Sequence, residues 1–177
     1  MRRNEKKRLM VALATLVSLA LAGLVGCSQN PAAPSDSADR AILKRVVPAG
    51  KLLEGENFTE VRVSAVEGGT VQLWDVELYF PPEALSSDTL ISIEIPDISQ
   101  FANHFGTDGL VFNVPVRVTM SYRDADLSNV DETHISLAWF NDHTGEWDVI
   151  ACRLDPFNKT VTGFVEHFSA YALITDE

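Results

Sequence analysis

From residue 59 onward, apolar and polar residues alternate within short segments that turn residues separate. Alternation with a period of two is typical of a β-strand that buries one face, and no segment shows the 3.6-residue period of an amphipathic helix. About eight or nine strands with turns every 8–12 residues predict one all-β domain, and we favour a single antiparallel β-sandwich over a barrel. The predicted strands span 59–66, 70–80, 89–95, 110–122, 134–140, 147–153, 159–166 and 169–175.

Prolines and turn residues add detail to this pattern. Residues 70–80 are predicted to form one long strand, which ends at a Pro-Pro pair because proline cannot donate a ladder hydrogen bond. Residues 83–85 are expected to form one helical turn, and residues 101–107 to be irregular. Pro115, within the longest segment, predicts an edge position or a bulge. The core face of 70–80 is predicted to carry Gln72, Trp74, Val76, Leu78 and Phe80.

The N-terminal residues follow a different pattern. A basic head at 1–8 precedes an unbroken apolar run at 9–21, which is the layout of a secretory signal peptide. The run leads into a sequence that resembles a bacterial lipobox, namely Leu24, Val25, Gly26 and Cys27. In bacterial lipoproteins a diacylglycerol is attached to the cysteine sulfur, and a peptidase cuts just before this residue. The resemblance implies a mature chain that begins at Cys27 and is anchored in a bacterial membrane.

Two other interpretations of this N-terminus stay open. An A-x-A site ends at Ala22, and cleavage there would give a soluble chain with a free Cys27. The apolar run, about 18 residues to Gly26, could instead remain as a marginal membrane span. Ser28 follows the cysteine, and this resembles lipoproteins of the Gram-negative outer membrane. We therefore expect an extracytoplasmic, lipid-anchored location, in the outer membrane if the envelope is Gram-negative.

Composition divides the chain into three parts. Residues 1–26 are the predicted signal peptide. Residues 27–44 are the lipidated cysteine and a flexible linker rich in proline, alanine, serine and aspartate. The domain is predicted to span 45–177, and the apolar patch at 41–47 is either a first strand or part of the tether.

Net charge excludes two classes of partner. Removal of residues 1–26 takes away five basic residues and one acidic residue, so the remainder has 9 basic and 24 acidic residues and a formal net charge of −15. Such a chain repels the phosphates of nucleic acids and anionic lipid headgroups, so neither is expected as a direct partner. With Cys27 lipidated, Cys152 has no partner for an intramolecular disulfide. It is expected to be a small buried apolar side chain, with a reactive thiol as the alternative.

Several motifs, in this order along the chain, resemble the ZU-five domain, first noted in zonula occludens proteins and uncoordinated-five netrin receptors. The motifs are Gly68-Gly69, the strand and Pro-Pro-x-Ala sequence at 78–85, the Val-Pro-Val strand at 114–122, a Trp-Phe and Thr-Gly-x-Trp hairpin at 139–147 typical of bacterial secreted members, and His167-Phe168-Ser169 with Tyr171. Glu83 departs from the family, which often has glycine there. The resemblance covers roughly 61–173 and implies a β-sandwich that acts as a protein-interaction or structural module.

The most specific chemical hypothesis concerns the tripeptide His167-Phe168-Ser169. In death-domain relatives of the ZU-five family, a His-Phe-Ser sequence cuts itself between Phe and Ser by an N-to-O acyl shift. The resemblance implies that His167 activates the Ser169 hydroxyl, which attacks the preceding carbonyl, and that water then hydrolyses the ester. The reaction needs backbone strain at Phe168 and donors for the oxyanion. The alternative is a buried, hydrogen-bonded pair of His167 and Ser169 with Phe168 packed opposite.

No motif predicts a cofactor or a zinc site. The four histidines are dispersed without a cysteine or carboxylate at metal-ligand spacing, and the chain lacks a P-loop, a Rossmann fingerprint and a Gly-x-Ser-x-Gly elbow. The acidic segment 124–132 begins like a calcium loop, but Asn129 and Ile135 stand where an EF-hand needs Gly and Glu. A looser calcium site or a solvated turn remains. The three tryptophans are expected to pack in the core and across strands rather than to form a carbohydrate platform.

The sequence therefore predicts a lipid-anchored envelope β-sandwich. It acts as an interaction or structural module for an envelope or extracellular protein that the sequence does not identify. Self-cleavage between Phe168 and Ser169 is the enzymatic alternative.

Overall fold

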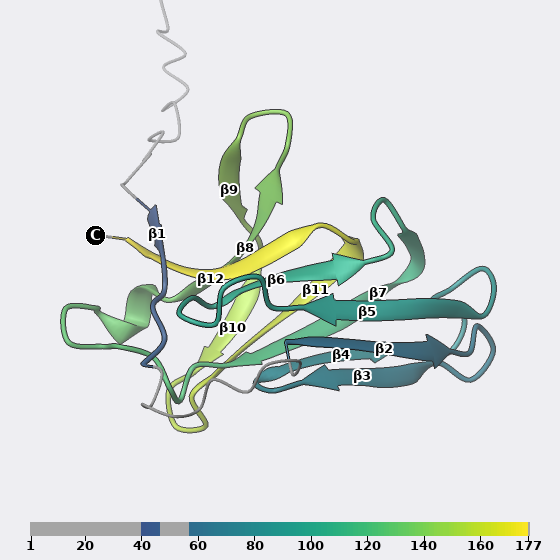
Figure 1. Cartoon of the computed structure of the whole chain (residues 1–177), viewed down its shortest axis with the longest axis horizontal. Helices are drawn as coiled ribbons and strands as arrows, with labels where there is room; N and C mark the ends of the chain where they lie inside the picture. The colour runs from purple at the N-terminus through teal and green to yellow at the C-terminus, as the bar shows by residue number, and fades with distance from the viewer. Residues whose placement is uncertain (1–39, 47–56, 177) are drawn as a thin grey trace, which may run out of the picture. The chain divides into compact units, whose positions relative to one another are not determined.

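A computed structural model describes residues 40–46 and 57–176, which form two antiparallel β-sheets packed face to face (Figure 1). Apolar side chains from both sheets make one cluster between them. This arrangement confirms the predicted antiparallel β-sandwich. The elements are β1 (Arg40–Ile42), β2 (Phe58–Val63), β3 (Gly69–Leu73), β4 (Val76–Phe80), β5 (Thr89–Glu94), β6 (Ala102–Gly106), β7 (Val111–Ser121), the 3-10 helix η1 (Glu132–His134), β8 (Ser136–Asn141), β9 (Glu146–Val149), β10 (Cys152–Asp155), β11 (Thr160–His167) and β12 (Ala170–Asp176).

The strands of the described residues divide unequally between the two sheets. One sheet has seven strands, in the order β2-β5-β6-β12-β8-β9 with β1 also paired to β12. The other has five, in the order β10-β11-β7-β4-β3. Because β11 and β12 belong to different sheets, the short connection between them passes from one layer to the other. The β8–β9 hairpin extends beyond the other strands in the view of Figure 1.

Alternation along the strands places every second side chain in the core. Val116, Val118 and Met120 of β7 are fully buried, as are Ile91 and Ile93 of β5 in the opposite sheet. Full burial of such a side chain contributes roughly 1.5–3 kcal/mol. The cluster between the sheets is therefore the main source of stability in this part of the chain.

Residues 70–80 form a hairpin rather than the predicted single strand. β3 ends at Leu73, β4 begins at Val76, and these two residues pair across the turn. Trp74 in this turn has a φ of 51°, a left-handed conformation that tight hairpin turns require and that usually selects Gly or Asn. The sequence does not predict this turn, because neither Gly nor Asn occurs in it. The core face carries Val71, Val76, Leu78 and Phe80, whereas Trp74 is half-buried and Gln72 is exposed.

Three other local predictions are wrong because tertiary contacts override the local pattern. Residues 101–107, predicted to be irregular, contain β6, which pairs with both β5 and β12. The strand predicted at 147–153 is divided where the chain leaves β9 in one sheet and enters β10 in the other. Residues 83–85 do not form a helical turn, because Glu83 has a φ of 66° and its N–H donates to the carbonyl of Ala65.

Pro115 lies at an interruption of the pairing around β7, as predicted. Pairing of β7 with β4 ends at Arg117, and the register with β11 shifts between Val165 and His167. A residue without an N–H group is tolerated there because the ladders on both sides are interrupted.

The apolar patch at 41–47 adds a strand. β1 pairs antiparallel with β12, and Leu43 is buried in the core. Among the described residues the sheet therefore begins at Arg40, before the predicted domain start at Arg45.

Arg45 fixes this first segment to both sheets. Its guanidinium group donates to Asp75 Oδ2 at 2.7 Å and to the carbonyl oxygen of Ile98 at 3.0 Å. It also lies 4.3 Å from the centroid of the Phe101 ring. The side chains of Arg45 and Asp75 are only 5% and 17% exposed. Loss of one partner of such a buried pair is costly because the other charge is left without compensation.

Burial raises the pKa of Asp75 above the ordinary value of 3.8, since desolvation outweighs the lowering effect of the Arg45 charge and hydrogen bond. A raised pKa favours the protonated carboxyl in the folded state. The resulting stabilisation is fully present below the unfolded pKa and is lost as the pH rises through the folded pKa. At neutral pH the positive charge of Arg45 compensates the ionised Asp75 carboxylate and so reduces the stability that is lost.

Arg45→Met is expected to destabilise the fold by about 3 kcal/mol near pH 7, because it leaves the Asp75 carboxylate buried without a counter-charge. Near pH 4 the cost is expected to be clearly smaller, since Asp75 without Arg45 stays protonated over a wider pH range. Urea denaturation of wild type and variant at both pH values measures this difference.

Arg117→Met is the matched control for this experiment. Arg117 pairs with Glu77, but the two side chains are 41% and 37% exposed. Its loss is therefore expected to cost less than about 1 kcal/mol. An equal cost of Arg45→Met at both pH values would contradict the role assigned to the buried charge of Asp75.

Candidate functional site

His167, Phe168 and Ser169 form the connection between β11 and β12, where the chain crosses from one sheet to the other. Phe168 is buried, and its ring centroid lies 4.8 Å from that of Phe112 and 5.9 Å from that of Phe105. His167 is the last residue of β11 and Ser169 precedes β12, so the two residues do not share one regular strand. Both are half-buried.

The hydrogen bonds of this connection overturn one interpretation of the sequence, the hydrogen-bonded pair of His167 and Ser169. Ser169 Oγ donates to the carbonyl oxygen of Phe140 at 3.1 Å, and His167 Nδ1 lies 3.4 Å from the carbonyl oxygen of Phe168. The expected hydrogen bond between His167 and Ser169 is not formed. Tyr171 Oη donates to the carbonyl oxygen of His167 at 2.8 Å, and burial raises the pKa of Tyr171, which keeps this donor protonated.

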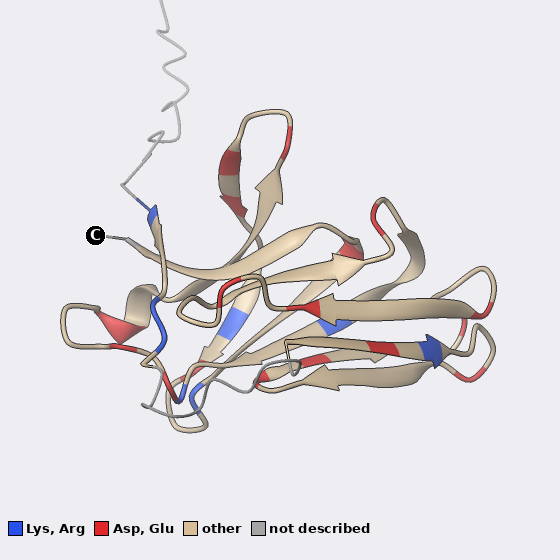
Figure 2. Cartoon of the chain, viewed as in Figure 1, with Lys and Arg blue, Asp and Glu red and all other residues tan. Residues whose placement is uncertain are grey.

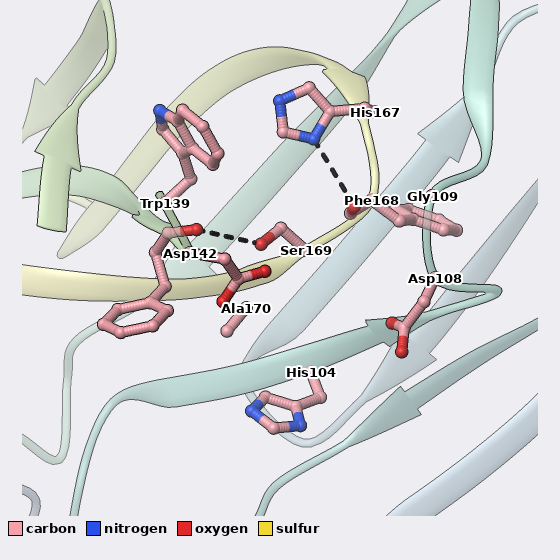
Figure 3. Close-up of a pocket in the computed structure, with 10 residues that line it drawn as sticks. His104, Asp108, Gly109, Trp139, Asp142, His167, Phe168, Ser169 and Ala170 are labelled. Atoms are coloured by element: carbon pink, nitrogen blue, oxygen red, sulfur yellow. Dashed lines mark hydrogen bonds between the residues drawn. The ribbon is translucent and has the colours of Figure 1, made fainter. Parts of the chain in front are cut away.

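The connection borders a cleft of about 530 Å³ (Figure 3). This volume lies within the range of roughly 300–1,000 Å³ that is usual for ligand sites. Four other segments build the cleft, namely β6, the turn between β6 and β7, the β8–β9 hairpin and the first residue of β12. The lining residues are His104, Asp108, Gly109, Trp139, Phe140, Asp142, His167, Phe168, Ser169 and Ala170.

The cleft combines aromatic surface with acidic groups. Trp139 packs edge-on against the ring of His167, with 4.9 Å between the ring centroids and an interplanar angle of 76°. Figure 3 shows the carboxyl groups of Asp108 and Asp142 and the ring of His104 around the space beside the β11–β12 connection. Lysine and arginine do not occur in the lining.

Asp108 and Asp142 differ from the other aspartates whose side chains are described. Among the aspartates whose side chains the structure describes, these two have no protein partner. The others each interact with another protein group, and they are Asp75, Asp88, Asp97, Asp124, Asp126, Asp131, Asp148 and Asp155. The two cleft carboxylates therefore hold no loop in place, and their hydrogen-bonding capacity is open to water or to a ligand.

This arrangement is suited to binding. A serine nucleophile needs a base at its hydroxyl, but the Ser169 hydroxyl donates to a backbone carbonyl instead. Within the described residues, no three His, Cys, Asp or Glu side chains converge in a way that could hold a metal ion. What the cleft offers is an aromatic wall, two carboxylates without protein partners and an exposed imidazole, that of His104.

The acidic segment 124–132 is held by its own hydrogen bonds. Asp126 accepts from the backbone N–H of Ser128 at 3.1 Å, and Asp131 accepts from that of Thr133 at 2.9 Å. Hydrogen bonds from the side chain and backbone of these two partners lower the pKa of both aspartates. The segment is thus a structured turn whose carboxylates serve as local caps.

The three tryptophans all make packing contacts within the protein, as predicted. Trp147 lies across the β8–β9 pair from Phe140, with 5.3 Å between ring centroids, and Trp74 packs beside a buried arginine. Trp139 packs against the main core cluster and also lines the cleft. Cys152 is a free thiol that packs against the apolar core as expected, but it is half-buried rather than buried.

Sequence reasoning found only part of this site. It singled out His167, Phe168 and Ser169, which are contiguous, but it missed His104, Asp108 and Asp142 as site residues. The sequence predicts turns at the Asp-Gly pair after β6 and at the loop after β8. It does not indicate that these two turns lie beside the same cleft.

The lipobox-like residues Leu24, Val25, Gly26 and Cys27 lie outside the described residues. In the part of the chain that is described, no helix is long and apolar enough to cross a membrane. Comparison of the chain with models of known protein families and with curated proteins gives no match. The likeness to lipoproteins and to ZU-five domains therefore rests on the motifs in the sequence.

Proposed function

We propose that this chain is a bacterial lipoprotein whose ZU-five-like β-sandwich binds a partner protein at the cleft. Residues 1–26 are the signal peptide, Cys27 carries the lipid, and the domain is held outside the cytoplasm, at the outer membrane in a Gram-negative envelope. The lipobox-like sequence supports the anchor. The single observation that supports the binding role is the cleft, where carboxylates without protein partners lie beside aromatic side chains.

The position of the cleft favours recognition of another protein. Its lining comes from strand ends and turns of a sandwich with a packed core, and such loops on a rigid scaffold commonly carry binding residues. Tryptophan and phenylalanine, both present in the lining, are enriched in protein–protein interfaces. The half-buried Trp139 can therefore serve as an anchor for a partner.

The anchor and the cleft act together in this proposal. Several fatty chains, at about 0.8 kcal/mol per buried CH₂ group, hold a domain durably at a bilayer. Confinement to the membrane surface raises the effective concentration of the cleft for a partner in the same envelope. A weak contact in solution then becomes sufficient for association at the membrane.

Cys27→Ser is expected to move the chain out of the membrane fraction and to abolish labelling by fatty acid, because a hydroxyl cannot form the lipid thioether. Fractionation after a detergent-free wash, combined with metabolic labelling, measures both effects. Cys152→Ser is the matched control and is expected to stay in the membrane fraction with its label. Membrane association of Cys27→Ser at the wild-type level would contradict the proposed anchor.

A photo-crosslinking amino acid at position 143, in the β8–β9 loop beside Asp142, is expected to give adducts of higher mass in intact cells. The control position is 157, where Phe157 is 93% exposed in the β10–β11 turn, at the opposite end of β11 from the cleft. Adducts from position 143 alone would support a partner at the cleft. Adducts from position 157 alone, or equally from both positions, would contradict it.

Self-cleavage is the second candidate function, and the contact of His167 with the peptide bond after Phe168 favours it. A hydrogen bond at this contact requires Nδ1 to donate, because a carbonyl oxygen only accepts, and it would polarise the carbonyl for attack by Ser169 Oγ. The serine proton is lost to a base, the C–N bond breaks as the ester forms, and the new amine takes up a proton. Water then hydrolyses the ester.

Denaturing mass spectrometry of the mature protein is expected to show one uncut chain, because the Ser169 hydroxyl donates to Phe140 rather than facing a base. Ser169→Ala, which removes the nucleophile, is the control and is expected to give the same uncut form. Separation of residues 169–177 from the wild type but not from Ser169→Ala would establish self-cleavage.

A further inference from the structure

The cleft carries two carboxylates and neither a lysine nor an arginine to pair with them. Asp108 and Asp142 line it, neither has a protein partner in the described part of the chain, and the lining contains no lysine or arginine. Figure 2 shows acidic but no basic residues on the β8–β9 hairpin and on the turn between β6 and β7. An anionic ligand would therefore be repelled from this cleft.

Aromatic side chains lie in the same cleft as these carboxylates. Trp139 and Phe140 come from β8 and are both half-buried. An aromatic ring attracts an organic cation through its quadrupole, with an energy of about 0.5–1 kcal/mol at exposed sites. The same surface accommodates the methylene stem of a long basic side chain.

Two other ligand classes fit these observations less well. A metal ion needs several ligands at short range, and no three His, Cys, Asp or Glu side chains among the described residues converge to supply them. A neutral sugar could stack on Trp139 and donate hydroxyl hydrogen bonds to the carboxylates, but it has no positive charge to match the charges of Asp108 and Asp142. A ligand that is both cationic and partly apolar uses the two carboxylates and the aromatic surface together.

We infer that the cleft binds the ammonium or guanidinium group of a lysine or arginine side chain on the partner protein. The charged head lies between Asp108 and Asp142, and the stem packs on Trp139. This inference rests on the proposed function and assigns the chemistry of the partner at that site. Both aspartates are exposed, so each contact is weak and salt-dependent, and selectivity comes from their combination with the aromatic wall.

Calorimetric titration of the full chain in detergent micelles tests the inference. The probe is the peptide acetyl-Gly-Gly-Lys-Gly-Gly-amide, and its comparison is the same peptide with norleucine, which lacks the ammonium group. We expect saturable binding of the lysine peptide and binding of the norleucine peptide that is at least about tenfold weaker. The double variant Asp108→Asn with Asp142→Asn is expected to weaken binding of the lysine peptide by at least about tenfold.

The control for charge is Glu60→Gln with Glu67→Gln, two exposed residues on β2 and in the turn after it. This variant changes the net charge by the same amount, and its affinity is expected to stay within about twofold of wild type. Equal losses in both double variants would show general attraction to an acidic protein and overturn the inference.

Two further probes separate the sources of the ligand. Putrescine tests a free amine, and tighter binding of putrescine than of the lysine peptide would overturn the assignment to a partner protein. Tighter binding of N-acetylglucosamine would overturn the cationic class itself. Adducts from position 143 in cells without binding of the lysine peptide would leave the proposed function standing and reject only this inference.

Discussion

The packing of Phe168 between the two sheets is the contact on which the arrangement of the candidate site depends. Its ring meets Phe80 and Phe112 from the five-stranded sheet and Phe105 from the seven-stranded sheet. Aromatic pairs of this kind contribute about 0.5–1.5 kcal/mol each beyond the burial of area. With this ring fixed in the core, the residues on either side of it are held at the end of the sandwich, where His167 and Ser169 border the cleft.

The same packing bears on the chemistry of the connection. Self-cleavage needs a strained backbone at the residue before the serine. Among the described non-glycine residues, the left-handed conformations occur at Trp74, Glu83 and Lys159, each of them outside the β11–β12 connection. Phe168 is instead held by apolar contacts on both sides. These features favour a connection that fixes the shape of the cleft.

The period of two in the sequence predicted most of the strands and the class of fold, because alternation depends only on which face of a strand is buried. It failed where a turn has no local marker, as at Trp74, whose left-handed backbone is not indicated by Gly or Asn. It also failed at 147–153, where one apolar stretch contributes to β9 in one sheet and to β10 in the other. The cleft was harder to predict, since His104, Asp108 and Asp142 come together only through the order of strands in the sheet.

The described aspartates divide into those that contact another protein group and those that have no protein partner. Asp75 is buried and receives an arginine whose side chain is 5% exposed, while Asp126 and Asp131 cap turns. In a chain with a formal net charge of −11, each such contact offsets part of the repulsion among acidic groups. Asp108 and Asp142 receive no such contact, although they lie in a concave surface beside aromatic rings. Neither group contributes a contact to the fold, and the positively charged ligand proposed above would give both of them a partner.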